Sequence, residues 1–383
     1  MISLAKRFLP AATVAELKDA WIFHAYHRAW RRAAAIQQSL IARTFPTASR
    51  WPLVPSLYAL LSGQYAREHR AVMYGRGLYA REVESEMLSS VRLRRNVHRL
   101  EKGLSMDRRR AVFGTEYIGE SLSSYDLVLQ AHRRANAPAS PELQWAHDVL
   151  SLYFQQSGSH PEIDRAKTRF RALEHRCEFQ GAVPFRRDLT KGDSIDVEEL
   201  GALAERRRSV RSFQARPVPR GMIDEALRIA ALSPTACNRQ PYRYFIFDEP
   251  DLIATISTMP PGVNGFQTDI PVFVAIVGQL RNYFSERDRR LIYIDSALSA
   301  MSFALALEVQ GLATCMINWA DLPGPERRVN KFLNLEPDER VVMCMAIGWP
   351  NENSLVPASI KKAPAQFSVY NQRSQAAAGE EPR

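Results

Sequence analysis

The sequence predicts an α+β fold, with a mainly helical first half followed by a three-layer domain of helices and short strands. Apolar residues recur at helical spacing through much of residues 14–177. Four short β-rich runs then alternate with helical stretches between residues 197 and 350. Charge also changes along the chain: the first 190 residues hold 29 Lys and Arg against 18 Asp and Glu, whereas the remainder holds 22 against 23. Such asymmetry indicates two parts with different roles.

Helices dominate the prediction for the first half. Ser140-Pro141-Glu142 is typical of a helix start, with a capping hydroxyl, a first-turn proline and an acid near the positive end of the helix dipole. Gly158 is expected to stop this helix after Gln156. The other helices are expected at residues 14–44, at 57–102 with an interruption near Gly75 and Gly77, and at 161–177.

The second half begins after residues 181–196, which contain Gly, Pro and charge without periodicity and are interpreted as a linker. Asp196 and Glu199 predict a capped helix over 197–206. Further helices are expected at 219–232, 252–258 and 286–310, and strands at 242–247, 271–278, 312–318 and 341–347. The predicted domains are a basic helical domain of unassigned role at 1–180, a second domain at 197–372 and a disordered tail at 373–383.

Composition argues against several classes of protein. The four cysteines are scattered and form no CxxC pair, which disfavours a disulfide framework or a zinc site and fits a reducing compartment. No apolar run approaches the ~18 residues of a membrane-spanning helix, and no long apolar core follows Lys6 and Arg7 as it would in a signal peptide. We therefore expect a cytoplasmic protein. All eight histidines precede residue 190, so the second half cannot build a Ser-His-Asp triad or a histidine metal site.

Three segments of the second half carry candidate chemistry. Residues 207–213 (RRSVRSF) place three guanidinium groups near a hydroxyl, and arginine binds phosphate through paired, charge-assisted hydrogen bonds. A solvated basic helix end is an equally weighted alternative for this segment taken alone. Residues 233–242 (SPTACNRQPY) form a loop that can present donors to a flat heterocycle, or an ordinary turn. Residues 308–319 contain a helix that stops at Gly311 and leads into a strand.

In order and spacing, these segments resemble the nitroreductase family from about residue 200 to 372. The family pattern runs R-R-S-x-R-x-F, then A-P-S-x-x-N-x-Q-P-W, then a central helix ending G-L-G-T, then a strand closing on G-Y-P. The matching stretches here are Arg207–Phe213, Ser233–Tyr242, Gly311–Thr314 and Ala346–Pro350. The resemblance implies a nitroreductase-like, FMN-dependent oxidoreductase that passes a hydride through flavin N5 from NAD(P)H to a nitro, quinone or enone acceptor.

The resemblance also implies the residues of the flavin site. Arg207, Arg208 and Ser209 would hold the FMN phosphate, and Arg211 would lie near the pyrimidine edge, where a cation stabilises charge on the reduced ring. Lys362, better placed than Lys361, would be a second phosphate contact, and Asn264 is a further candidate. The loop residues that would border the ring are Pro234, Thr235, Ala236, Asn238 and Gln240. In this family the loop reaches the flavin of the other subunit, so a homodimer with flavin at its interface is implied.

The sequence departs from the family in several places. Tyr242 replaces the usual tryptophan, and residues 316–319 (MINW) do not reproduce a Pro-x-Glu-Gly found near some flavins. The segment before the 271–278 strand is short and would lack a helical excursion that shapes the substrate pocket. No catalytic side chain is required beyond the flavin. Cys237 and Cys315 have no histidine nearby in sequence, so we interpret them as packing residues.

In the first half, His98 and Glu101 share a helix face, but the di-iron pattern places Glu before His, which favours a structural role. His24 and His27 also share a helix face, and for them too a structural role is favoured over metal binding. The basic clusters at 92–99 and 108–110 favour a solvated or subunit-facing surface, with peripheral contact to an anionic surface as the alternative. No specific nucleic-acid signature is present.

Two alternative functions stay open at this point. The first is a specialised flavin oxidase or reductase that acts on a biosynthetic, for example polysaccharide-linked, substrate, because fold does not determine function. The second is a scaffold with a degenerate flavin domain, whose basic helices dock on an anionic surface. Bound flavin without NAD(P)H-dependent turnover would favour the first, and salt-sensitive vesicle binding without any turnover would favour the second.

Overall fold

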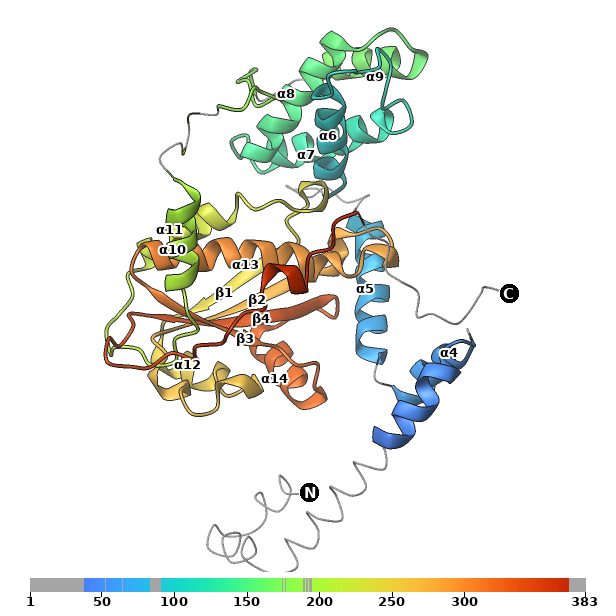
Figure 1. Cartoon of the computed structure of the whole chain (residues 1–383). Coiled ribbons are helices and arrows are strands. Elements are labelled where there is room, and N and C mark those ends of the chain that lie inside the picture. The colour runs from blue at the N-terminus through green and yellow to red at the C-terminus, as the bar shows by residue number, and fades with distance from the viewer. Residues whose placement is uncertain are drawn as a thin grey trace, which may run out of the picture. The chain divides into compact units, whose positions relative to one another are not determined.

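In the computed structural model the chain divides into two compact units, residues 1–70 and 71–383. Figure 1 labels the helices and strands of the described residues. In the first unit, residues 38–48 are helical, α4 spans Leu53–Ser62, and the rings of Phe45 and Tyr58 pack edge to face at 5.2 Å. The described residues are 38–51, 53–63, 65–82, 91–173, 175, 177–188, 190, 192 and 195–371. Predictions that lie outside these residues are most of the 14–44 helix, the pair His24 and His27, and the tail at 373–383.

Helix α5 (Ala66–Glu82) runs unbroken through Gly75 and Gly77, so the predicted interruption there is wrong. Gly75 has a packing role instead. A Cβ atom at Gly75 would lie 2.9 Å from both the carbonyl carbon and the Cβ of Leu280. The absence of a side chain therefore lets α5 approach the short 3-10 turn η4 (Leu280–Asn282) closely. Local propensity pointed to a break because glycine is a weak helix former, but tertiary contact decides the outcome here.

Four helices of the second unit share one apolar core. As predicted, the Ser140 hydroxyl caps α8 by accepting a hydrogen bond from the backbone N–H of Leu143 at 3.2 Å. Helix α9 ends earlier than expected, because the backbone is extended at Leu173. The sequence pattern missed α7, which buries serines on its core side. The four helices are α6 (Val91–Leu104), α7 (Ile118–Arg134), α8 (Pro141–Gln156) and α9 (Pro161–Ala172).

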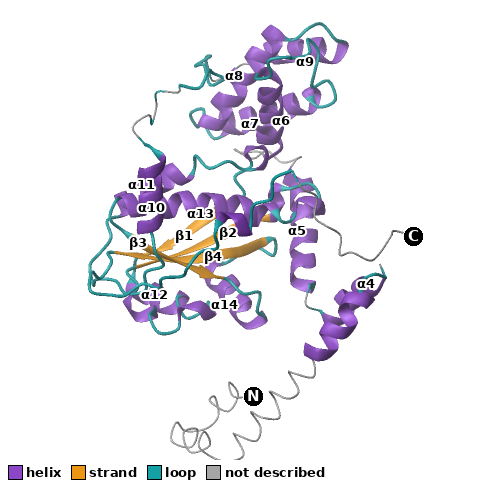
Figure 2. Ribbon diagram, in the orientation of Figure 1, coloured by secondary structure: helices purple, strands orange, loops and turns teal. Residues whose placement is uncertain are grey.

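A four-stranded sheet follows later in the second unit, with the strand order β1-β2-β4-β3 and all neighbouring pairs antiparallel (Figure 2). All four strands begin and end within two residues of their predicted bounds. The strands are β1 (Tyr242–Phe247), β2 (Val272–Gln279), β3 (Ala313–Asn318) and β4 (Glu339–Gly348).

Helices cover both faces of this sheet, which confirms the predicted α+β layers (Figures 1 and 2). Helices α11 and α13 form one buried core with the sheet, and α12 and α14 form another on the opposite face. Helix α10 packs on α13. Its N-cap residue is Asp196, whose carboxylate accepts a hydrogen bond from the Glu199 N–H at 2.7 Å as predicted. The helices are α10 (Val197–Arg206), α11 (Arg220–Ala230), α12 (Pro250–Ile256), α13 (Leu291–Val309) and the unpredicted α14 (Pro323–Leu333).

One helical stretch of the described chain, Glu286–Val309, is long and apolar enough to cross a membrane by length and composition alone. This finding corrects the expectation that no apolar run is long enough. Most of the stretch is α13, whose Phe303, Ala304 and Leu307 are completely buried in the core against the sheet. Burial within the fold accounts for the apolar composition of this helix.

Replacing Gly75 with alanine is expected to lower the free energy of unfolding by ~1–3 kcal/mol, because the new methyl group overpacks the contact with Leu280. Gly77→Ala is the matched control on the same helix, since no atom lies within 4 Å of a Cβ there. Removing a helical glycine should raise stability by ~0.5–1 kcal/mol in the control. Urea denaturation of both variants measures the difference, and equal stabilisation of the two would disprove the close approach.

Candidate functional site

The arginine segment, residues 207–213, runs along the outer edge of β3. Ser209 forms a parallel bridge with Thr314, and the backbone N–H of Val210 donates to the Thr314 carbonyl at 3.1 Å. Further along, Phe213 is buried and bridges Pro350 just beyond β4. The structure thus brings the predicted arginine segment together with the predicted helix–strand corner that ends at Thr314.

The cations of the arginine segment are not neutralised within the described chain. The neighbouring Arg206 pairs with Glu308 at 3.0 Å. None of the ion pairs found among the described residues involves Arg207, Arg208 or Arg211. Uncompensated guanidinium groups in one short segment attract an anion, and a phosphate matches their planar donor geometry.

Cys315, in β3, lies beside this segment. Burial raises the pKa of its thiol, while the nearby positive charges of Arg211 and Arg207 act in the opposite direction. The side chain belongs to the apolar core, which agrees with its interpretation as a packing residue. Arg211 in turn donates from Nη1 to the Ser209 carbonyl at 3.2 Å, which holds its guanidinium next to the segment.

The small-residue loop, residues 233–240, joins α11 to β1 and has a strained backbone. Cys237, Asn238 and Gln240 have φ angles of 53°, 53° and 49°, in the left-handed region that disfavours residues with a Cβ. Gln240 donates from its backbone N–H to the Thr235 hydroxyl at 3.2 Å and from Nε2 to the Asn238 side chain at 3.1 Å. Strain of this kind persists only where surrounding contacts enforce it, and it is concentrated at functional sites.

A carboxylate of α13 anchors this loop. Oδ2 of Asp295 accepts hydrogen bonds from the Ala236 N–H at 3.0 Å and from the Tyr283 hydroxyl at 3.1 Å. Burial raises the pKa of Asp295, and these two hydrogen bonds oppose that effect. Asp295 was not predicted as a site residue, although it is the single charged residue in the apolar stretch 291–307, a signal that could have revealed it.

Arg239 lies within the loop with only 3% of its surface exposed. Its carbonyl accepts a hydrogen bond from Asn282 Nδ2 at 3.3 Å, and its guanidinium lies 5.1 Å from the ring centroid of Tyr283. The positive charge favours the ionised form of Asp295 and so lowers the pKa of that carboxyl. Arg239 therefore supplies a countercharge at the point where the loop meets α13.

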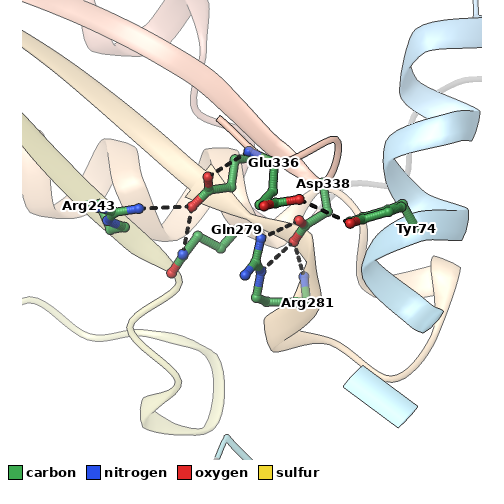
Figure 3. Close-up of polar contacts among 7 residues, drawn as sticks. Tyr74, Arg243, Gln279, Arg281, Glu336 and Asp338 are labelled. Atoms are coloured by element: carbon green, nitrogen blue, oxygen red, sulfur yellow. Dashed lines mark hydrogen bonds and ion pairs between the residues drawn. The ribbon is translucent and has the colours of Figure 1, made fainter. Parts of the chain in front are cut away.

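A polar network surrounds Arg281, which lies two residues before Tyr283 in the chain (Figure 3). Arg281 donates from its backbone N–H and Nε to Asp338 Oδ2 at 3.0 and 2.9 Å, and from Nη2 to Oδ1. Asp338 is completely buried, and a paired, charge-assisted contact of this kind is among the stronger hydrogen-bonded interactions. Nearby, the Tyr74 hydroxyl of α5 donates to Glu336 at 3.0 Å. The network thereby positions the tyrosine that shares the Asp295 carboxylate with the loop.

The arginine segment and the small-residue loop lie at diagonally opposite corners of the sheet within one chain, since β3 and β1 are its two edge strands. Tyr242 pairs with Gly278 and, through β2, with Arg340 at the start of β4, whereas Ala313 pairs with Gly348 at its end. At ~4.8 Å between strands and ~3.4 Å per residue, these corners are on the order of 30 Å apart. A small-molecule pocket of ~300–1,000 Å³ is on the order of 10 Å across, so one chain does not place both segments around one ligand.

Other predicted site residues are found at the surface. Asn264 is exposed at the end of the 3-10 turn η2 (Pro261–Val263), which lies against β3, the edge that carries the arginine segment. Lys361 and Lys362 are exposed in the segment after β4. Between α12 and β2 the described chain has η2 and one further 3-10 turn and no α-helix, in agreement with the predicted lack of a helical excursion there.

Helix α13 also presents an apolar stripe to the surface. Ile294, Leu298 and Met301 follow one another at helical spacing, with 52%, 45% and 39% of their surfaces exposed. A contiguous exposed apolar row on a helix is typical of a surface that another chain covers.

The histidine–glutamate pair of α6 makes local contacts. His98 Nδ1 lies 3.5 Å from Glu101 Oε2, and Glu101 Oε1 accepts a hydrogen bond from the Trp145 indole at 3.2 Å. Within the described ranges, no group of three or more His, Cys, Asp or Glu side chains is arranged to hold a metal ion. These contacts give Glu101 a structural partner.

Comparison with known proteins finds similarity for part of the chain. The model of the family described as Nitroreductase family matches residues 204–259 and 258–349. Iodotyrosine deiodinase 1 of Sus scrofa is 24% identical over 200 residues, which cover 45% of this chain and 68% of that protein. Iodotyrosine deiodinase of Drosophila melanogaster is 25% identical over 247 residues, covering 56% of this chain and 84% of that protein.

Solved structures give similar matches. An FMN-dependent nitroreductase from Clostridium difficile is 17% identical, with a TM-score of 0.38 and coverage of 45% of this chain and 98% of that one. A nitroreductase family protein from Streptococcus pneumoniae is 21% identical, with a TM-score of 0.39 and coverage of 45% and 100%. These matches fall on less than half of this chain.

Replacing Asp295 with alanine is expected to lower the free energy of unfolding by ~2–4 kcal/mol, because it leaves the Ala236 N–H and the Tyr283 hydroxyl buried without their acceptor. Asp295→Asn keeps an acceptor oxygen and should cost less. Hydrogen exchange of residues 233–240 should speed up in the alanine variant, and urea denaturation gives the stability. Unchanged exchange in the loop would disprove the anchoring role.

Comparing the wild type with Asp295→Asn also gives a prediction for the pH dependence of stability. Because the folded-state pKa of Asp295 is raised, the folded state holds this proton more tightly than the unfolded state does. The carboxyl group therefore contributes stability at low pH that is lost as pH rises through its folded pKa. Asparagine does not titrate, so Asp295→Asn should gain stability relative to the wild type as pH rises from acid values towards neutrality, as measured by urea denaturation across pH. A difference that moves the other way would contradict the assigned direction.

Proposed function

We propose that the chain is an FMN-dependent oxidoreductase, from the premise that residues 204–349 form a nitroreductase-family domain. In this proposal the enzyme moves a hydride from NAD(P)H to an electron-poor acceptor. The observation that carries this proposal is the arginine segment, with three cations free of carboxylate partners among the described residues beside the hydroxyl-bearing Ser209. This donor set fits a phosphate ester. When bound, FMN would supply a ring nitrogen that accepts and returns a hydride.

The chain's own residues would bind and orient this cofactor. Arg207, Arg208 and Ser209 would hold the phosphate, and Lys362 would add a second cation. Arg211 would stabilise the negative charge that reduction places on the pyrimidine edge, because a fixed cation at that position needs no rearrangement. The loop residues that would border the ring are Pro234, Thr235, Ala236, Asn238 and Gln240.

The flavin site in this proposal is shared between two copies of the chain. Opposite corners of one sheet carry the arginine segment and the loop, and a twofold-related partner can bring each corner against the complementary one. The exposed stripe of Ile294, Leu298 and Met301 supports such a partner, because α13 runs between the two corners. A homodimer would then hold two equivalent sites.

The names of the relatives favour a second class of acceptor. Iodotyrosine deiodinases act on a halogenated aromatic ring by name, so reductive removal of a halogen is a candidate reaction beside nitro, quinone and enone reduction. Among the described residues, Cys237, Cys315 and Cys344 form no disulfide. A reducing, cytoplasmic setting with NAD(P)H as the electron donor belongs to the same proposal.

The purified chain is expected to be yellow, absorbing between about 350 and 500 nm, and to bleach on addition of NADH or NADPH. The double variant Arg207→Ala/Arg208→Ala should lose at least ~90% of its bound flavin, since each lost phosphate contact weakens binding about tenfold or more. Absorbance of the purified proteins measures the flavin content.

The matched control is Arg220→Ala/Arg228→Ala, which removes two exposed arginines of α11 that pair with Asp248 and Glu225. The control should retain its flavin. Equal flavin loss in both double variants would point to a general charge effect, and a colourless wild-type chain that cannot be reconstituted with FMN would end the proposal.

Mixing two defective chains tests whether the site is shared. One chain carries Arg207→Ala/Arg208→Ala and the other carries Asn238→Ala/Gln240→Ala. If each site takes its arginines from one copy and its loop from the other, random reassortment leaves about one quarter of the sites intact. Flavin content and NAD(P)H-dependent turnover should then recover to roughly that fraction.

Recovery should appear only after the two chains have been unfolded and refolded together. Each variant refolded alone is the control and should stay inactive. Mixed samples that remain as inactive as the separate variants, while size-exclusion chromatography shows reassorted dimers, would show that both halves of the site belong to one chain.

A further inference from the structure

A basic pocket of about 480 Å³ lies at the end of α6 and in the loop that follows it. This volume is within the range of small-ligand sites. Glu116 is the single carboxylate of its lining. The five cationic residues of the lining are Arg99, Lys102, Arg108, Arg109 and Arg110.

These five cations have no carboxylate partner among the ion pairs of the described residues. Arg109 donates to the side-chain oxygen of Gln156 instead. Other arginines of the same helix, Arg92 and Arg94, do pair with glutamates. The positive charge is therefore left uncompensated where the surface is concave, and a concave, low-dielectric wall concentrates the resulting field.

Packing contacts hold the aromatic part of the pocket wall, together with Arg99, in place. The ring of Phe113 lies so close to Gly103 that a side chain at that position would overlap it. The Tyr153 hydroxyl donates to the Phe113 carbonyl and holds the loop from behind. The Arg99 guanidinium stacks 3.6 Å from the ring centroid of Tyr117, which limits its freedom. Preformed walls distinguish this pocket from a mobile, solvated basic surface.

We propose that this pocket binds a phosphorylated small molecule that carries at least two negative charges. Arg99 and Lys102 from α6 and the arginines at 108–110 are its phosphate contacts. The rings of Phe113 and Tyr117 receive the less polar part of the ligand. None of the residues assigned to the flavin lines this pocket. The result of testing the pocket is therefore independent of the oxidoreductase proposal.

Titration calorimetry of the purified full chain with sodium pyrophosphate, at constant ionic strength, tests the pocket. The variant Lys102→Gln/Arg108→Gln removes two exposed cations of the lining and should weaken pyrophosphate binding about tenfold or more. Arg186→Gln/Arg187→Gln removes the same charge from two exposed arginines outside the pocket and should bind like the wild type. Thermal melting checks that all variants are folded.

The variant Arg99→Lys keeps the charge but loses the planar stack on Tyr117, and it should show an intermediate loss of affinity. Equal weakening in the pocket and control double variants would overturn the proposal, because it would indicate a diffuse charge effect. So would the absence of measurable heat for the wild type at millimolar pyrophosphate.

Phosphatidic acid vesicles distinguish a lipid headgroup from a soluble ligand. A lipid headgroup is supported as the ligand if two results are found together. Pyrophosphate displaces the wild-type chain from the vesicles, and the variant Lys102→Gln/Arg108→Gln no longer binds them. Pyrophosphate binding without vesicle binding supports a soluble ligand. Vesicle binding that pyrophosphate does not displace would overturn the pocket and indicate a broad basic surface instead.

Discussion

The carboxylate of Asp295 is the contact on which the candidate site most depends. It is buried, yet it accepts hydrogen bonds both from the loop at Ala236 and from Tyr283. A buried carboxylate is unfavourable unless such donors and a nearby cation offset the loss of water, and Arg239 provides that cation. The position of Tyr283 depends in turn on the nearby ion pair of Arg281 with the buried Asp338. Successive polar contacts therefore connect the strained loop to the start of β4.

Local signals in the sequence predicted the elements that depend on local physics. The β-rich runs, the hydroxyl cap at Ser140 and the acidic cap at Asp196 all form as expected, because strand patterning and capping act over a few residues. Gly75 misled the prediction, since its role depends on a segment two hundred positions away in the chain. The contacts of Asp295 and the buried position of Arg239 were missed for the same reason: they depend on elements that are distant in sequence.

The sequence also predicted which segments matter without predicting where they lie. The arginine segment and the corner at Thr314 are brought together by backbone pairing. The loop is not, because the strand order places β1 and β3 at opposite edges. No pattern within 233–240 encodes that separation, since strand order is decided by the packing of the whole sheet. The proposed site, shared between two copies, would bring these separated motifs together around one ligand.

The pairing of the arginine segment with β3 has a consequence for solubility. An edge strand exposes a row of unpaired backbone groups that can recruit strands from other molecules. Ser209 and Val210 occupy part of that row on β3, through the bridge and hydrogen bond to Thr314. If the segment detached, the open edge of an apolar strand that contains the buried Cys315 would become available for intermolecular pairing. The segment that contains the proposed phosphate-binding arginines thus also covers part of the open sheet edge.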